Sequence, residues 1–242
     1  MNGDRRGANI SESNHMHHIR PNKIFTLVNT PPAQRVIQVQ LPPCRGGGGV
    51  TLLETCLLIA ANQIISGHRV FEFGTFLGST TLNLALNVPE GGEVLTLDLG
   101  EGCIDEVKQH PADAPLTEAR MTSRSLDFVG SSVAHRITML EGNSITYDFS
   151  PWKDSIDLVF VDGGHDRTTV KSDTEHALEM VAKNKESCIL WHDYHRPEYG
   201  DLSTYLDGLS QQMHLFHIED TALCVWFNDP KNVICPRLRQ NS

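Results

Sequence analysis

Short apolar runs alternate along the chain with longer segments whose apolar residues recur at helical spacing. The short runs have the length and composition of buried strands, and they cover residues 69–73, 93–98, 136–140, 157–161 and 188–191. Helical spacing is found at residues 51–64, 80–88, 168–182 and about 202–209. Because strands of this kind that alternate with helices form parallel sheets buried on both faces, the pattern predicts an α/β fold.

Two further apolar runs, at residues 213–218 and 222–227, are separated only by "EDT". Such a short link predicts an antiparallel hairpin at the end of the sheet. At the start of the first helical segment, Thr51 followed by Glu54 predicts a capping box. We therefore expect a mostly parallel, Rossmann-like sheet of seven strands with helices on both faces and an antiparallel C-terminal hairpin.

The flanking segments lack this periodicity. We expect residues 1–49 to form a flexible N-terminal arm followed by a Gly/Pro-rich linker or lid, residues 50–228 to form the folded domain, and residues 229–242 to form a tail. Within the domain, residues 101–132 mix charges with two prolines. We expect a short helix there and an excursion over one face of the sheet.

Composition limits the functional classes. The chain has 242 residues, is 39% hydrophobic and carries a formal net charge of -10, which fits one domain with a full core and disfavours a nucleic-acid partner. The sequence shows neither a membrane span nor the apolar core of a signal peptide, so we expect a soluble, cytoplasmic protein. A small molecule is the expected partner, and assembly into a homo-oligomer stays open.

The candidate chemistry lies where the strands end. In an open parallel sheet, ligands bind at the carboxyl ends of the strands, where loops converge and helix N-termini present free N–H groups. Each of the five expected parallel strands ends at or beside an acid. The residues at these ends are Glu72, Gly74, Thr75 and Gly78, then Asp98, then Glu141, Gly142, Asn143 and Ser144, then Asp162 and His165, and last His192, Asp193 and Tyr194.

The first turn, "EFGTFLGST", favours a sharp bend and close approach of a ligand to the backbone. It is not the G-x-G-x-x-G pattern of dinucleotide-binding folds, because Phe76 stands where the middle glycine would be. Asp98 follows Gly78 by 20 residues, at the tip of the second strand, where a carboxylate can accept both hydroxyls of a ribose. A helix cap or loop acid is the alternative interpretation of Asp98.

Taken in order, "EFGTFLGSTTLNLA", "VLTLD", "EGNS", "IDLVFVDGGHDRTTVKSD", "CILWHDY" and the terminal hairpin resemble the class I S-adenosylmethionine-dependent methyltransferases. The resemblance covers about residues 50–228 and is greatest to the small-molecule O-methyltransferase-like branch with a D-G-x-H motif. It implies methyl transfer from S-adenosylmethionine to a small-molecule hydroxyl. The residues it implies for cofactor binding are Glu72, Gly74, Thr75, Gly78, Asp98, Asn143, Ser144 and Asp162.

Similar metal-dependent O-methyltransferases carry metal ligands after the fourth and fifth strands. The resemblance therefore implies that Asp162, His192 and Asp193 hold Mg²⁺ or another divalent cation, with His165, Asp162 and His192 as catalytic residues. Methyl transfer to a hydroxyl needs the acceptor deprotonated, which a cation promotes and a histidine base completes. The relatives usually have Asp-Asn where this chain has His192-Asp193, so metal ligation stays open.

Other interpretations remain. His165 can cap the following helix instead of accepting a proton, and His192 can lie behind the ligands or act as the base without a metal. Two further functions compete with methyl transfer: an NAD-type nucleotide-dependent oxidoreductase, and an S-adenosylmethionine-binding module that has lost catalysis.

Overall fold

A computed structural model describes residues 15–28, 36–41, 49–123 and 125–229. Parts of the expected arm and linker (1–14, 29–35 and 42–48) and nearly all of the expected tail (230–242) lie outside the described residues. Within them, the strands are β1 (His17–Ile19), β2 (Arg69–Phe73), β3 (Glu93–Asp98), β4 (Ile137–Glu141), β5 (Leu158–Val161), β6 (Cys188–Trp191), β7 (Phe216–Ile218) and β8 (Cys224–Phe227). The α-helices are α1 (Pro21–Leu27), α2 (Leu52–Ile64), α3 (Ser79–Asn87), α4 (Ala114–Thr122), α5 (Arg167–Met180) and α6 (Gly200–Ser210).

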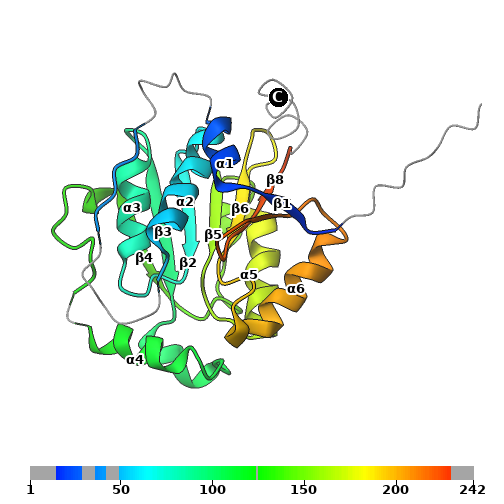
Figure 1. The fold of residues 1–242 in the computed structure, drawn as a ribbon. Helices are drawn as coiled ribbons and strands as arrows, with labels where there is room; N and C mark the ends of the chain where they lie inside the picture. The colour runs from blue at the N-terminus through cyan, green and yellow to red at the C-terminus, as the bar shows by residue number, and fades with distance from the viewer. Residues whose placement is uncertain (1–14, 29–35, 42–48, 124, 230–242) are drawn as a thin grey trace, which may run out of the picture.

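The strands form one 8-stranded sheet in the order β1-β7-β8-β6-β5-β2-β3-β4 (Figure 1). Every pairing is parallel except those of β8 with β6 and β7, so the mostly parallel sheet and the antiparallel hairpin are confirmed. The chain runs from β2 to β3 and β4 on one side, and returns to β5 and β6 on the other. This reversal of strand order at β2 and β5 is the place where open α/β sheets bind ligands.

The predicted number of seven strands is wrong by one, because β1 lies inside the segment expected to form the arm. It pairs in parallel with β7, with His18 opposite His217. The sequence "HHI" has no strand signature of its own, so the unpaired edge of β7 and not local propensity defines this strand. The following helix α1 begins at Pro21 and buries Ile24 and Leu27. Two apolar positions are too few to reveal a helical period in the sequence.

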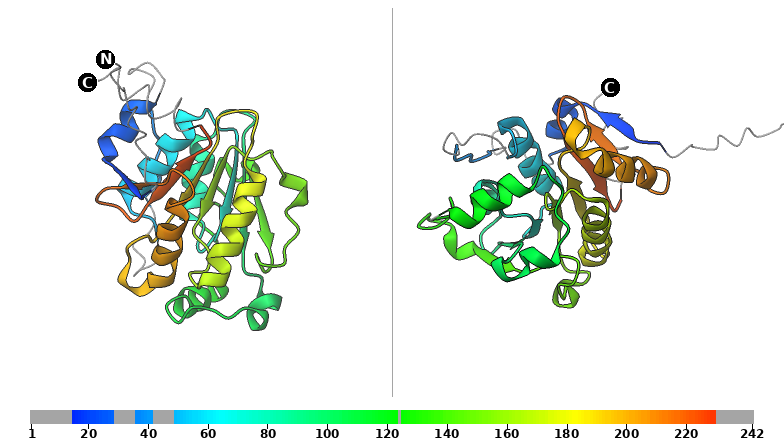
Figure 2. Two further views of the ribbon diagram at one scale, coloured as in Figure 1. Left: turned by 90° about the vertical axis from the view of Figure 1, so that its right-hand side faces the viewer. Right: turned by 90° about the horizontal axis from the view of Figure 1, so that it is seen from below.

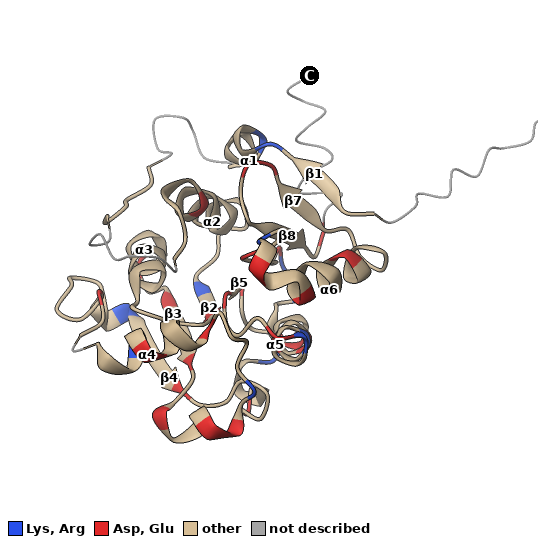
Figure 3. Ribbon diagram, turned by 60° about the horizontal axis from the view of Figure 1, so that its bottom comes forward, with Lys and Arg blue, Asp and Glu red and all other residues tan. Residues whose placement is uncertain are grey.

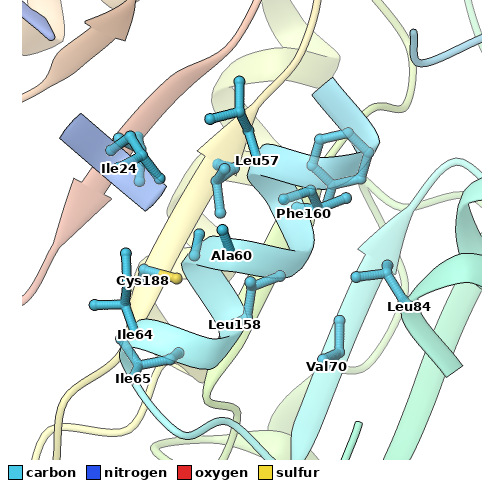
Figure 4. Close-up of a cluster of buried hydrophobic side chains, with 14 of the residues drawn as sticks. Ile24, Leu57, Ala60, Ile64, Ile65, Val70, Leu84, Leu158, Phe160 and Cys188 are labelled. Atoms are coloured by element: carbon cyan, nitrogen blue, oxygen red, sulfur yellow. The ribbon is translucent and has the colours of Figure 1, made fainter. Parts of the chain in front are cut away.

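Two hydrophobic cores flank the sheet, because alternate residues of each strand point to opposite faces. On one face, α1, α2 and α3 cover a cluster that includes Ile24, Leu57 and Phe160 (Figure 4). On the other face, α5 and α6 cover a second cluster, to which Val159 and Leu206 belong. This double covering explains why β5 and β6 are continuously apolar and not alternating.

Side chains at the helix starts fix where α2 and α5 begin. The capping box of α2 is confirmed, since Thr51 and Glu54 exchange hydrogen bonds between side chains and backbone. At α5, Asp166 accepts hydrogen bonds from the N–H groups of Thr168 and Thr169. Asp166 and not His165 is therefore the N-cap of this helix, which leaves His165 available for another role.

Residues 101–122 lie across the carboxyl edge of the sheet and not over one of its faces, as the view from below shows (Figure 2). They form a short 3-10 helix, Glu101–Glu106, followed by α4. Among the described residues, no helix is long and apolar enough to cross a membrane.

Candidate active site

A cavity of about 760 Å³ opens at the carboxyl edge of the sheet, under α4. Figure 3 looks toward this edge and shows acidic positions gathered near β2, β3 and β5. The cavity brings together most of the residues expected at the strand ends, namely Gly74, Thr75, Asp98, Asn143, Ser144, Asp162, His165, His192 and Asp193. Of the residues expected at the strand ends, Glu72, Gly78, Glu141 and Tyr194 are not among the described residues that line it.

The two glycines of the first turn are required by contacts within the protein. Gly74 has a φ of +87° and a side chain there would meet the backbone oxygen of Asp162 at 2.1 Å. Gly78 has a φ of +83°, and its side chain would meet the ring of Phe128 at 2.7 Å. The positive φ values fit the expected sharp bend, and contacts within the protein give a further reason for glycine at both positions. At Gly74 the crowding comes from the adjacent end of β5.

Glu72 connects three elements behind the cavity. Its carboxyl is fully buried, accepts a 2.6 Å hydrogen bond from Thr96 on β3 and also bonds the hydroxyl of Thr81 on α3. Burial raises the pKa of Glu72 to about 8, against the opposing effect of the two threonine hydroxyls. The second carboxyl oxygen, Oε1, is buried and has no hydrogen-bond partner among the described residues.

At one end of the cavity, Asp98 is paired with a residue that the sequence did not single out. Arg120, on α4, places Nε 3.1 Å from Oδ2 of Asp98 and Nη2 3.7 Å from Oε1 of Glu141. The other oxygen of Asp98 accepts the N–H of Leu99 at 2.9 Å. Burial raises the pKa of Asp98, and the Arg120 guanidinium opposes that rise. Asn143 adjoins this end, where its side chain folds back to accept the N–H of Ile145.

At the other end, three residues converge within 4.8 Å of one another: Asp162, His165 and Asp193. Nε2 of His165 lies 2.9 Å from Oδ2 of Asp193. Nδ1 of His165 lies 2.8 Å from Oδ1 of Asp113, whose second oxygen accepts the peptide N–H of His165 at 3.1 Å. The imidazole also stacks on Tyr199, with ring centroids 3.8 Å apart. Carboxylates on both sides therefore fix the orientation of the ring.

His192 lies behind this cluster. Only 3% of its surface is exposed; Nδ1 is 3.0 Å from Oδ1 of Asp162 and 3.3 Å from Oδ1 of Asp193. Nε2 points away from them, 3.4 Å from Oε2 of Glu54 at the start of α2. The expected grouping of His192 with the two aspartates is thus found, but the three-residue cluster within 4.8 Å contains His165 in place of His192.

The charges of this cluster support one another. Burial lowers the pKa of His165, but Asp113 and Asp193 outweigh it and raise the pKa to about 9. The pKa of His192 is raised in the same way, by Asp162, Asp193 and Glu54 against the effect of burial. Burial raises the pKa of Asp162, whereas the two histidines hold the pKa of Asp193 below its usual range despite burial. The neighbouring carboxylates thus favour the protonated form of both imidazoles.

The backbone at this end is unusual as well. Asp193 has a φ of +61° immediately after the buried strand β6, and His195 has a φ of +63°. Residues other than glycine that adopt this conformation cost roughly 1 kcal/mol or more and cluster at functional sites. The turn directs the Asp193 carboxylate toward His165.

Sequence reasoning missed Asp113, Arg120 and Tyr199. The first two lie in the segment whose pattern was weakest, and nothing in their spacing marks them. Glu54 was assigned to the capping box alone, although the same carboxylate also accepts the N–H of Ala222 at 2.7 Å and faces His192. No sequence signal links Glu54 to His192, because the two residues are 138 positions apart.

A doubly wound sheet with an antiparallel final strand and an acid-lined cavity at its carboxyl edge is the arrangement of a class I methyltransferase. The sequence profile of a family described as a methyltransferase domain matches residues 71–194, which run from within β2 to three residues beyond β6. The chain belongs to this family, and it is an S-adenosylmethionine-dependent methyltransferase. Neither the oxidoreductase nor the non-catalytic module is favoured.

Solved structures share this fold at low sequence identity. A candidate caffeoyl-CoA O-methyltransferase from Staphylococcus aureus is 12% identical, with 74% of this chain and 84% of that chain covered and a TM-score of 0.54. A candidate O-methyltransferase from Klebsiella pneumoniae is 16% identical, with 74% and 81% covered and a TM-score of 0.51. The methyltransferase PaMTH1 from Podospora anserina, bound to S-adenosylhomocysteine, is 16% identical, with 88% and 89% covered and a TM-score of 0.51. A search of curated proteins found no match to the sequence.

Proposed function

We propose that this methyltransferase acts on the hydroxyl of a small organic molecule, and that the reaction takes place at Asp162, His165 and Asp193. The observation that carries the proposal is the single cavity, which joins the Asp98 end to this cluster. One continuous space of about 760 Å³ lies in the upper part of the range of small-ligand sites and leaves room for a cofactor and an acceptor side by side. The formal net charge of -10 favours an acceptor that is not a polyanion.

The residues at the Asp98 end fit S-adenosylmethionine. Asp98 offers a carboxylate for ribose hydroxyls, Asn143 and Ser144 offer polar side chains for the adenine, and Thr75 lies in the turn before α3. The bound cofactor supplies an electrophilic methyl group on a sulfonium. Glu72 and Gly78 support this end from behind, since they lie outside the lining.

The donor set at the reaction end fits a divalent cation. Asp162 and Asp193 supply the hard carboxylate oxygens that Mg²⁺ prefers, and His165 lies within the same 4.8 Å cluster. A cation held there would lower the pKa of a bound hydroxyl. We assign ligation to the two aspartates, with His192 holding Asp162 from behind instead of completing the set.

We assign the acceptor's proton to His165. Asp113 anchors Nδ1 and the peptide, which leaves Nε2 as the ring nitrogen on the side of Asp193. His192 is less suited to act as the base, because its second ring nitrogen faces Glu54 and not the two aspartates. Neutralisation of the Asp193 charge lowers the pKa of His165, so cation binding and base function are expected together.

The test is a methyl-transfer assay with labelled S-adenosylmethionine on a panel of hydroxyl compounds. His165→Ala is expected to lower turnover by about 10² to 10⁴, the usual contribution of a positioned base, with binding of S-adenosylhomocysteine unchanged within about twofold. His68→Ala, at an exposed histidine before β2, is the matched control. Undiminished turnover in His165→Ala would refute the assignment of the base.

A further inference from the structure

Residues 36–41 lie beside α3 as an extended segment held by two asparagines (Figure 1). Asn83 accepts the N–H of Gln40 at 2.8 Å and donates to its carbonyl at 3.1 Å. Asn87 does the same with Gln38, at 2.9 and 2.7 Å. Each side-chain amide therefore pairs with the backbone as a neighbouring strand would.

The spacing of these pairs follows from backbone geometry. Asn83 and Asn87 are one helical turn apart, about 6 Å along the axis, and Gln38 and Gln40 are about 6.6 Å apart in an extended chain. The match lets both amides bind at once. Gln63 of α2 adds a third contact by donating to the carbonyl of Val36 at 2.9 Å. We call residues 36–41 the strap.

The strap contributes apolar side chains to the cavity. Because alternate residues of an extended chain point the same way, Val39 and Leu41 share one face, and both line the cavity. Val50 and Leu52 line it as well, from the start of α2. Leu41 is 70% exposed and Leu52 is 55% exposed, so both lie at the mouth. We call these four residues the apolar rim.

The apolar rim and the reaction centre line the same cavity. Leu41 and Leu52 are among its lining residues, as is the cluster of Asp162, His165 and Asp193. Exposed leucines at the mouth of a cavity leave apolar surface in water that a ligand can cover. The interior beyond them is polar and acidic. The cavity thus presents a polar end for chemistry and an apolar edge for binding.

We propose that the apolar rim is the specificity determinant for the methyl acceptor, which carries its hydroxyl on an apolar body, and that Asn83 and Asn87 position the strap for this purpose. The inference rests on the proposed transfer to a hydroxyl. It adds the class of acceptor: an amphipathic molecule with a hydrocarbon or aromatic surface, in contrast to a small polar alcohol.

The test compares phenol with 2-naphthol, which carry the same hydroxyl and differ by one fused ring. Direct binding to the enzyme saturated with S-adenosylhomocysteine is measured by calorimetry, independently of turnover. We expect 2-naphthol to bind about tenfold more tightly than phenol, and Leu41→Ser with Leu52→Ser to remove that preference. Val129→Ser is the matched control, because Val129 is 62% exposed and is not among the residues that line the cavity.

Asn87→Ala tests the positioning role. It is expected to weaken 2-naphthol binding about as much as Leu41→Ser does, and the double variant to lose little more, since both act through the strap. Asn87→Ala and Leu41→Ser should leave phenol and S-adenosylhomocysteine binding within about twofold of wild type. Loss of S-adenosylhomocysteine binding in these variants would instead make the strap a cofactor lid and overturn the proposal.

Equal binding of phenol and 2-naphthol by the wild-type enzyme, or binding of neither, also overturns it. Failure of the proposed function has a different signature. In that case 2-naphthol binds preferentially and the preference depends on Leu41 and Leu52, but no hydroxyl compound in the panel is methylated.

Discussion

Asp113 binds His165 through two contacts at once, accepting the peptide N–H at 3.1 Å and lying 2.8 Å from the ring Nδ1. The carboxylate comes from the segment that lies across the carboxyl edge of the sheet, at the residue before α4. His165 belongs to the loop between β5 and α5. One side chain therefore joins the cover of the cavity to its reaction end and fixes which ring nitrogen faces Asp193.

Loss of this contact should lower the rate without weakening cofactor binding. Asp113→Ala is expected to lower kcat about 10- to 100-fold, the usual effect of removing an outer partner of a catalytic or metal-binding histidine. Asp113→Asn should lose less, since its amide oxygen still accepts a hydrogen bond. Glu118→Ala, at an exposed position of α4, is the control. An equal loss of S-adenosylhomocysteine affinity in Asp113→Ala would show a general disturbance of α4 instead.

Asp98 is predicted to be the carboxylate that holds the ribose. Asp98→Asn should weaken S-adenosylhomocysteine binding about tenfold, because a hydrogen bond to a charged group contributes about 1.5–3 kcal/mol and the neutral amide retains part of it. Isothermal calorimetry gives the affinity directly. Glu141→Ala is the matched control, since its 64% exposed carboxylate also faces Arg120. Equal affinities for Asp98→Asn and wild type would assign Asp98 to the ion pair with Arg120 alone.

Replacing Glu72 tests whether this acid supports the fold or binds the cofactor. Its pKa is about 8 in the folded protein and near 4.5 when unfolded, so the unfolded state releases its proton first as pH rises. Stability should therefore fall between about pH 4.5 and 8, by at most about 5 kcal/mol from this group. Glu72→Gln should flatten that part of the stability profile and leave S-adenosylhomocysteine affinity unchanged. Chemical denaturation at several pH values measures the first effect, and a large loss of affinity would contradict the structural role.

The cation site predicts a dependence on divalent metal. Dialysis against a chelator should lower methyl transfer at least about tenfold, and added Mg²⁺ should restore it. Asp162→Asn and Asp193→Asn should weaken Mn²⁺ binding, as followed by electron paramagnetic resonance, whereas His192→Gln should weaken it less. Full activity in the presence of chelator would favour the metal-free interpretation, with histidine acting alone.

The centre of the sheet was predictable because β5 and β6 are continuous apolar runs with an acid within two residues of their ends. Continuous burial on both faces imposes that composition, so Leu158–Val161 and Cys188–Trp191 could be located within one residue of their observed bounds. β1 could not, since three residues with no pattern become a strand only through the free edge of β7. Its pairing is a tertiary effect that local sequence does not encode.

The cavity lining followed from the same logic, since ligands gather where parallel strands end. The sequence could not predict which residues close the cavity from the side of α4. Asp113 and Arg120 reach it from a segment without a clear pattern. Asp113 pairs with His165, 52 residues away, and Arg120 pairs with Asp98, 22 residues away. The sequence also could not decide whether His165 or His192 is the better candidate for the base. That depends on which ring nitrogen each histidine directs toward the carboxylates.

β1 has a practical consequence for anyone who shortens this chain. The backbone of residues 17–19 covers the outer edge of β7, with the N–H of His17 bonded to Leu215 and the carbonyl of Ile19 to Glu219. A truncation that removes these residues would leave a row of unpaired amide groups, which recruits strands from other molecules. We expect such a protein to aggregate and to lose yield, although every residue of the cavity is still present. Residues that look dispensable in the sequence therefore pair with the backbone of β7.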